Sequence, residues 1–80
     1  MTDRAEIKEW LELAESHHTH MIVVCDTFDH EDFPVYVDST EDPRSIADNY
    51  DRKEMCRVME IYNLKLSFDS QLKESRCYNF

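Results

Sequence analysis

The segment from Asp26 to Asp32 holds the densest group of reactive side chains in this 80-residue sequence. It carries four carboxylates and the imidazole of His30 within seven residues. Oxygen ligands of this kind suit hard cations such as Mg²⁺ or Ca²⁺. The EF-hand pattern fails, however, because its invariant glycine is missing. We therefore predict a solvated acidic loop, with a metal site at 26–32 as the alternative.

Histidines and cysteines offer two further chemistries. His17, His18 and His20 could bind zinc with Cys25, but no second pair of ligands follows at a spacing typical of zinc sites. Cys25 and His30 could act as nucleophile and base. A thiol in an apolar strand is usually inert, and no orienting group is apparent. We predict no catalytic residue, no metal ligand and no cofactor, and expect that the chain is not an enzyme.

The composition limits the classes of protein to which the chain can belong. Eighty residues suffice for a single domain, 1–80, and 41% of them are apolar, too many for a disordered acidic tail. The chain contains no glycine, which excludes phosphate-binding loops, dinucleotide-binding fingerprints and nucleophile elbows. Left-handed backbone positions are then expected at Asp or Asn, with four candidates: Asp29, Asn49, Asn63 and Asn79.

Targeting and redox features predict a cytoplasmic protein. The three cysteines are odd in number and share no CxxC spacing, which favours reduced thiols. The first residues lack the basic and apolar regions of a signal peptide. No stretch of eighteen apolar residues is available to cross a membrane.

Hydrophobic periodicity predicts an α+β fold that begins with an N-terminal helix and an antiparallel β-hairpin. A four-residue apolar stripe that starts at Ile7 indicates a helix from about residue 3 to 18, with the histidines at its end. Apolar and β-branched runs at 21–25 and 33–37 indicate two strands joined as a hairpin. Pro34 lacks a donor N–H, which favours an edge position for the second strand.

The second half is predicted to be mainly helical. We expect a short helix from Pro43 to about Asn49, a longer helix over 51–62 and a final short helix over 69–76. The longer helix is predicted from one apolar face: Met55, Val58, Met59 and Tyr62. Residues 64–68 alternate in hydrophobicity and could form a third strand or a connection between helices.

The negative charge is concentrated in the middle of the chain. Residues 26–51 contain nine acids and one base, a net charge of −8, whereas the whole chain carries −9. Such a field favours encounter with basic surfaces and repels polyanions. We predict a non-enzymatic protein that docks a basic partner protein, as an inhibitor or a mimic of nucleic acid. The simpler interpretation is a solvated face that maintains solubility.

Nine residues are predicted to form this docking surface. Six supply charge and three supply the apolar anchors that usually dominate interface energies. The acidic residues are Asp29, Glu31, Asp32, Asp38, Glu41 and Asp42, and the apolar ones are Phe28, Phe33 and Tyr36.

Nucleic acid or a nucleotide is the alternative partner. Residues 45–61 are similar to a helix-turn-helix pattern, and the second predicted helix would carry Arg52, Lys53 and Arg57. Binding to phosphates would act against the net charge of the chain, so we expect this partner less than a basic protein. The exposed edge of a hairpin would also favour a homodimer.

Two segments resemble small acidic proteins encoded by bacteriophages. They are residues 21–37, MIVVCDTFDHEDFPVYV, and residues 55–64, MCRVMEIYNL. The resemblance carries no activity and no functional residues to this chain. It implies an accessory phage protein that acts in the bacterial cytoplasm by binding a host or phage protein.

Overall fold

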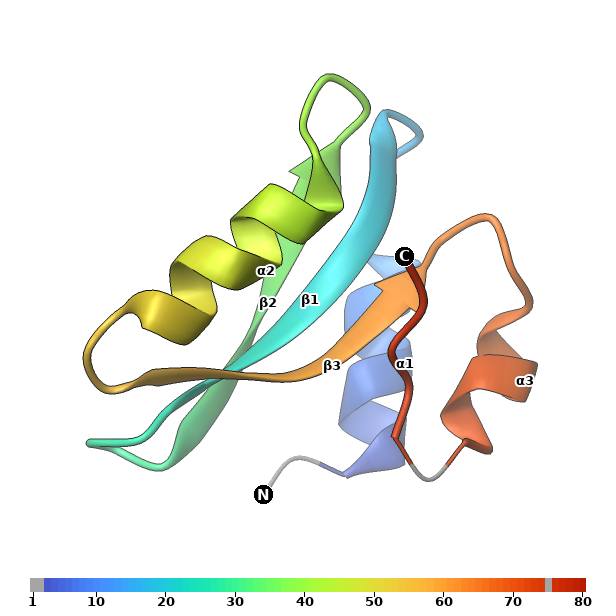
Figure 1. The fold of residues 1–80 in the computed structure, drawn as a ribbon. Coiled ribbons are helices and arrows are strands. Elements are labelled where there is room, and N and C mark those ends of the chain that lie inside the picture. The colour runs from blue at the N-terminus through green and yellow to red at the C-terminus, as the bar shows by residue number, and fades with distance from the viewer. Residues whose placement is uncertain (1–2, 75) are drawn as a thin grey trace.

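A three-stranded antiparallel sheet lies between helices in the computed structural model, which describes residues 3–74 and 76–80 (Figure 1). The strand order is β2-β1-β3. Helix α2 covers one face of the sheet, and α1 and α3 lie on the other. The elements are α1 (Arg4–Glu12), β1 (His18–Asp26), β2 (Glu31–Asp38), α2 (Pro43–Arg52), β3 (Cys56–Asn63) and α3 (Phe68–Leu72). The predicted α+β class is confirmed.

The central strand β1 divides the core into two layers. Met21 and Val23 pack against the α1 side, and Ile22 and Val24 pack against the α2 side. All four side chains are buried, because successive residues of a strand point to opposite faces and both faces are covered. This double burial explains the uninterrupted apolar run in the sequence.

The predicted hairpin is confirmed, with wider bounds than expected. Strands β1 and β2 pair antiparallel from His18↔Asp38 to Asp26↔Glu31. Pro34 lies in β2, and β2 is an edge strand, as predicted. Since β3 pairs with the other side of β1, β2 and β3 are the two edge strands of the sheet, and residues 77–79 cover the edge of β3 only beside Ile61.

The prediction of a first helix extending to about His18 was wrong. Helix α1 ends at Glu12, and the histidines do not form its C-terminus. His18 and His20 lie in β1, where His20 pairs with both Val37 and Asn63. Pairing with two neighbours stabilises the extended backbone here.

The predicted helix over 51–62 was also wrong, because residues 56–63 form β3. A β-bulge accounts for the misleading periodicity. Val24 faces Val58 and Val23 faces Glu60, so Met59 is an extra residue in β3. Val58 and Ile61 therefore pack on the α2 side although they are three residues apart, which imitates helical spacing.

The rest of the chain differs from prediction in smaller ways. Residues 64–68 are not a strand; residues 64–67 form a turn and Ser67 caps α3, which ends at Leu72 rather than Arg76. Helix α2 extends past Asn49 to Arg52. Among the described residues, positive φ angles occur at His30 and Met55 and not at the four Asp and Asn candidates. None of the helices within residues 3–74 and 76–80 is long and apolar enough to cross a membrane.

Candidate functional site

The hairpin end is the part of the sheet where the β1–β2 turn lies beside the α2–β3 connection; it comprises residues 26–32 and 53–55 (Figure 1). The Asp26 carboxylate accepts hydrogen bonds from the N–H groups of Phe28 and Asp29, at 2.9 and 3.3 Å. The Thr27 N–H donates to the Met55 carbonyl at 2.8 Å. These bonds hold both connections in place without burying their side chains.

Two large apolar side chains are exposed at the hairpin end. Phe28 is 70% exposed and Met55 is 57% exposed. His30 and Met55 have φ angles of 58° and 61°, in the left-handed region that costs residues other than glycine about 1–2 kcal/mol. The Met55 carbonyl accepts from the Thr27 N–H, and strained residues are common at binding sites.

Acidic residues surround these apolar side chains. Residues 26–32 and 51–57 together contain six acids and three bases, a net charge of −3. Two of the bases have partners within the chain. Arg52 lies 3.2 Å from Asp48, and the Lys53 ammonium lies 5.1 Å from the centre of the Tyr50 ring. The hairpin end therefore presents an apolar pair within a negative rim.

The structure divides the six predicted acidic residues between opposite ends of β2. Asp29, Glu31 and Asp32 lie at the hairpin end. The other three, Asp38, Glu41 and Asp42, lie at the end of β2 and in the connection to α2. Strand β2 has eight residues, so its ends lie about 23 Å apart at the usual rise of a strand.

The three acids after β2 build local structure. The Asp38 carboxylate accepts from the Thr40 N–H at 3.2 Å, and this bond lowers the pKa of Asp38. Glu41 accepts from the Asp38 N–H at 3.0 Å. Asp42 caps α2 by accepting from the N–H of Arg44 and the hydroxyl of Ser45. Their oxygens are already engaged in the turn and the helix cap.

The acids of the hairpin end are engaged to different degrees. Asp32 hydrogen-bonds to the thiol of Cys25, and burial together with this bond raises the pKa of Cys25. Within residues 3–74 and 76–80, the carboxylates of Asp29 and Glu31 have no hydrogen bond or ion pair. These two charges are available to a partner.

The three predicted apolar anchors do not share a surface. Phe28 is exposed at the hairpin end. Phe33 packs on the α2 side of the sheet, where its ring centre lies 6.3 Å from that of Tyr50. Tyr36 packs on the α1 side and donates a 2.6 Å hydrogen bond to the Trp10 carbonyl. Phe33 and Tyr36 thus contribute to the core layers.

The histidines gather at the opposite end of the sheet. The two ring nitrogens of His17 lie 3.4 Å from Glu15 and 3.9 Å from Asp38. Burial, with a contribution from Lys65, lowers the pKa of His20. Within the described part of the chain, no three His, Cys, Asp or Glu side chains are arranged to hold a metal ion, either here or at 26–32.

The basic residues of the nucleic-acid alternative lie on different elements. Arg52 ends α2, Lys53 follows it, and Arg57 lies in β3. The predicted helix-turn-helix over 45–61 does not form, because its second helix is replaced by β3. No single helix presents these three cations.

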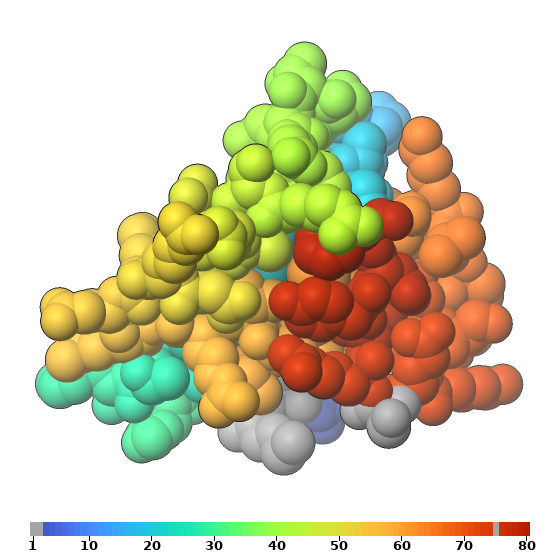
Figure 2. Space-filling view, viewed as in Figure 1, coloured from blue at the N-terminus to red at the C-terminus, as the bar shows by residue number. Residues whose placement is uncertain are grey.

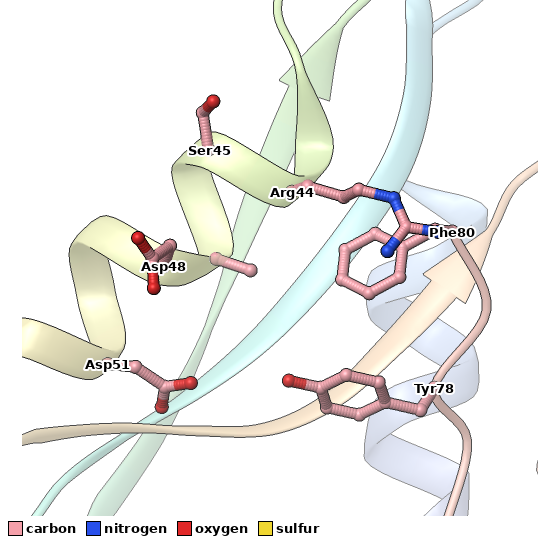
Figure 3. A pocket seen from close by; sticks show the side chains of 7 residues that line it. Arg44, Ser45, Asp48, Asp51, Tyr78 and Phe80 are labelled. Carbon is pink, nitrogen blue, oxygen red and sulfur yellow. The ribbon is translucent and has the colours of Figure 1, made fainter.

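A groove lies between α2 and residues 76–80, and no pattern in the sequence predicted it; Figure 2 shows it as a hollow on the face toward the viewer. It has a volume of about 410 Å³. Figure 3 shows Asp51, Tyr78 and Phe80 directed toward the space between the helix and the last residues of the chain, whereas Ser45 and Asp48 point away from it. The residues that line the groove are Arg44, Ser45, Ala47, Asp48, Asp51, Tyr78 and Phe80.

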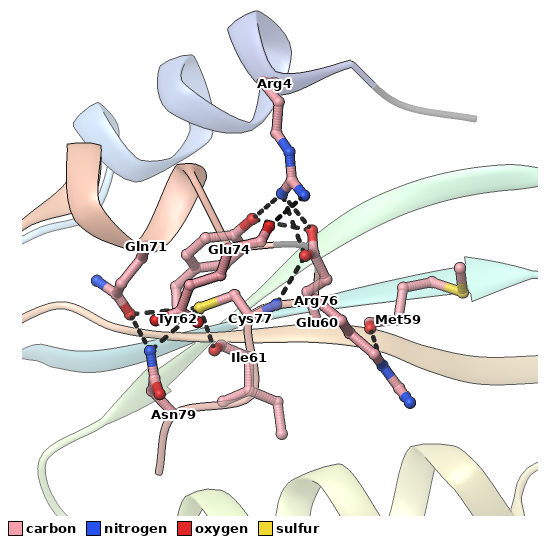
Figure 4. Close-up of polar contacts among 10 residues, drawn as sticks. All are labelled: Arg4, Met59, Glu60, Ile61, Tyr62, Gln71, Glu74, Arg76, Cys77 and Asn79. Carbon is pink, nitrogen blue, oxygen red and sulfur yellow. Dashed lines mark hydrogen bonds and ion pairs between the residues drawn. The ribbon is translucent and has the colours of Figure 1, made fainter.

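A polar network joins α1, β3 and the last residues of the chain (Figure 4). Glu60 accepts from Arg4 at 2.9 Å, from the Tyr62 hydroxyl at 2.8 Å and from the Cys77 N–H at 2.9 Å. Gln71 accepts from the Asn63 N–H at 2.8 Å and donates to the Asn63 carbonyl at 2.9 Å. Tyr62, Gln71 and Cys77 are buried, and the residues of the network are bonded to one another, so their role is structural.

The same network shifts two pKa values. Burial raises the pKa of Tyr62, and the bond to Glu60 adds to the shift. Burial, with the nearby Glu74 and Glu60, raises the pKa of Cys77 to about 12. Perturbed pKa values often mark functional sites, but both side chains are fully buried and cannot meet a substrate.

No protein-family model matches this chain, and neither the curated proteins nor the solved structures include a significant match. The candidate site therefore rests on the geometry of this chain itself.

Proposed function

We propose that the chain is a non-enzymatic binding protein that docks a basic protein through the hairpin end. The observation that carries the proposal is Phe28, whose side chain is 70% exposed while its backbone is held by Asp26. A rigidly presented aromatic ring is the usual anchor of a protein interface. Its acidic surroundings select a basic partner.

The contact surface differs from the nine residues of the sequence-based prediction. It comprises Phe28, Asp29, Glu31 and Met55, with Asp32 at its margin. Phe33, Tyr36 and the acids after β2 support the fold instead. Because of the resemblance to phage proteins, we choose a bacterial lysate as the source of the partner.

The test is affinity capture with a charge-reversed variant and a matched control. Asp29→Lys/Glu31→Lys changes the charge of the hairpin end by +4. Glu9→Lys/Glu12→Lys makes the same change at exposed positions of α1. Each tagged protein is incubated with a bacterial lysate, and retained proteins are identified by mass spectrometry.

We expect the unaltered chain and the α1 control to retain one basic protein that the hairpin variant loses. Equal retention by both variants would show that the position of the charge change does not matter, and would refute a specific hairpin surface. Retention of nucleic acid in place of a protein would also refute it.

A further inference from the structure

The outer edge of β2 presents backbone groups that the fold leaves unpaired. Strand β2 lies on the side of β1 away from β3 (Figure 1). The Asp38 N–H points away from β1, since it donates to the Glu41 carboxylate at 3.0 Å. Because successive residues of a strand direct their backbone groups to alternate sides, Tyr36 and Pro34 also direct theirs outward. Within the described part of the chain, the Tyr36 N–H and carbonyl and the Pro34 carbonyl have no partner there.

The opposite edge of the sheet, along β3, is already occupied by the chain itself. Its outward backbone groups are bonded to the Asp51 carboxylate, to residues 76–79 and to the Gln71 side chain. The strand residues concerned are Val58, Met59, Ile61 and Asn63. An incoming strand therefore finds unpaired backbone groups beside β2.

The sequence of β2 opposes pairing with a second copy of this chain. Two antiparallel copies centred on Pro34 would set two residues without an N–H against each other. Centred on Val35, they would set Asp32 of each copy opposite Asp38 of the other, and like charges directly opposite are destabilising. Centred on Tyr36, they would set Pro34 opposite Asp38, whose backbone groups are bonded within the chain.

The side chains around this edge suit a strand that is apolar in the middle and cationic at its ends. Residues 26–41 contain six acids and no lysine or arginine, and the hydrogen bonds that some of them accept leave their negative charge in place. Such a field attracts cations. Phe33 and Val35 are only partly buried on the α2 side of β2, so a neighbouring apolar side chain would cover them further.

From these features we infer that β2 takes up an extended basic segment of the partner protein as a fourth strand of the sheet. The segment would bond to the backbone of Tyr36 and Pro34 and place lysine or arginine near both ends of β2. Since β2 begins at the hairpin end, one partner can contact both surfaces. The inference deepens the proposed function, on which it rests, by naming the form in which the partner binds.

The test is a titration of the full chain, labelled with ¹⁵N, with the capped peptide KVTVTVKK. In antiparallel register its first residue lies opposite Asp38 and its last two lie opposite Asp32 and Glu31. The Tyr36 amide should exchange with solvent about tenfold more slowly when the chain is saturated with peptide. The Val35 amide already points to β1 and should change little.

Two N-methylated peptides form a matched pair. Methylation of the third residue removes the N–H that would donate to the Tyr36 carbonyl, and should raise the Kd about tenfold. Methylation of the fourth residue removes an N–H that points away from β2, and should leave the Kd within about twofold. The acidic peptide EVTVTVEE should not bind, because its charges repel those of β2.

A variant of the chain tests the same edge from the other side. Pro34→Ala adds an outward N–H and should lower the Kd for KVTVTVKK about threefold. An unchanged or higher Kd in a folded Pro34→Ala chain would contradict backbone pairing at this position.

Three further results would overturn the inference: an unchanged Tyr36 exchange rate at peptide concentrations up to about 1 mM, equal Kd values for the two methylated peptides, or equal binding of the acidic peptide. Capture of the basic partner through Asp29 and Glu31 reports on the hairpin end. Its success beside an unprotected Tyr36 amide refutes only the fourth strand, whereas protection beside a failed capture refutes only the hairpin surface.

Discussion

Polar side chains are buried and bonded along the outer side of β3, whereas at the hairpin end they are exposed. Beside β3, Glu60 and Gln71 are largely buried, and their oxygens and nitrogens are bonded to several elements. At the hairpin end, Asp29 and Glu31 lie in water beside an exposed Phe28. Acidic and amide side chains stabilise the fold in the first region and remain available to a partner in the second.

The comparison shows why perturbed pKa values are a poor guide to function in this chain. The largest shifts, at Tyr62 and Cys77, belong to groups that water does not reach. Substitutions beside β3 should therefore lower the free energy of unfolding. Substitutions at the hairpin end should change binding alone.

The largest effect on stability is expected for Glu60→Ala. The substitution leaves Arg4, the Tyr62 hydroxyl and the Cys77 N–H without their acceptor. We expect a loss of about 3 kcal/mol in the free energy of unfolding, measured by urea denaturation. Glu60→Gln retains an acceptor oxygen and should cost less. A loss below about 1 kcal/mol for Glu60→Ala would contradict the conclusion that the polar residues beside β3 stabilise the fold.

Alkaline pH should weaken the network through Cys77. The unfolded thiol loses its proton near pH 9.0, whereas the folded thiol keeps it up to about pH 12. The unfolded chain then binds fewer protons, so stability falls as pH rises, by about 1 kcal/mol from pH 9 to 10. Cys25, whose pKa burial also raises, adds to the fall in the same direction.

Unfolding curves at a series of pH values, for the unaltered chain and for Cys77→Ala, measure this contribution. The variant should show a shallower fall in the free energy of unfolding above pH 9. An identical slope in the two proteins would mean that Cys77 does not carry the pH dependence.

A smaller effect on stability should distinguish Asp42 from Asp29, which both lie in acidic turns of the sequence. Asp42→Ala removes the cap of α2 and should cost about 1 kcal/mol. Asp29→Ala should change stability by less than about 0.5 kcal/mol, because its carboxylate has no bond within the described residues. Thermal unfolding of both variants measures the difference, and equal losses would contradict the division of roles.

The β1–β2 hairpin was predictable because its signals are local. A buried apolar run, a short polar turn and Pro34 sit next to one another in the sequence. Strand β3 was not predictable, because the extra residue Met59 interrupts the alternation of buried and exposed residues. Apolar residues on one face of β3 are then three positions apart, as in a helix. The position of residues 76–80 depends on hydrogen bonds to Ile61 and Gln71. No pattern within residues 76–80 predicts partners so far away in the sequence.

The candidate site was predictable in part. The sequence indicated an acidic hairpin turn with Phe28, which the structure exposes. Phe33 and Tyr36 are three residues apart in one strand, and this odd offset already places them on opposite faces. Met55 was missed because it was assigned to the core of a helix, and its exposure depends on the start of β3.

The most direct test of the account compares stability and binding in Asp29→Lys/Glu31→Lys. We predict that this variant unfolds within about 0.5 kcal/mol of the unaltered chain and no longer retains the basic partner. Glu9→Lys/Glu12→Lys should retain it. A hairpin variant that still retains the partner, or that loses it only by unfolding, would contradict the assignment of the hairpin end as the docking surface.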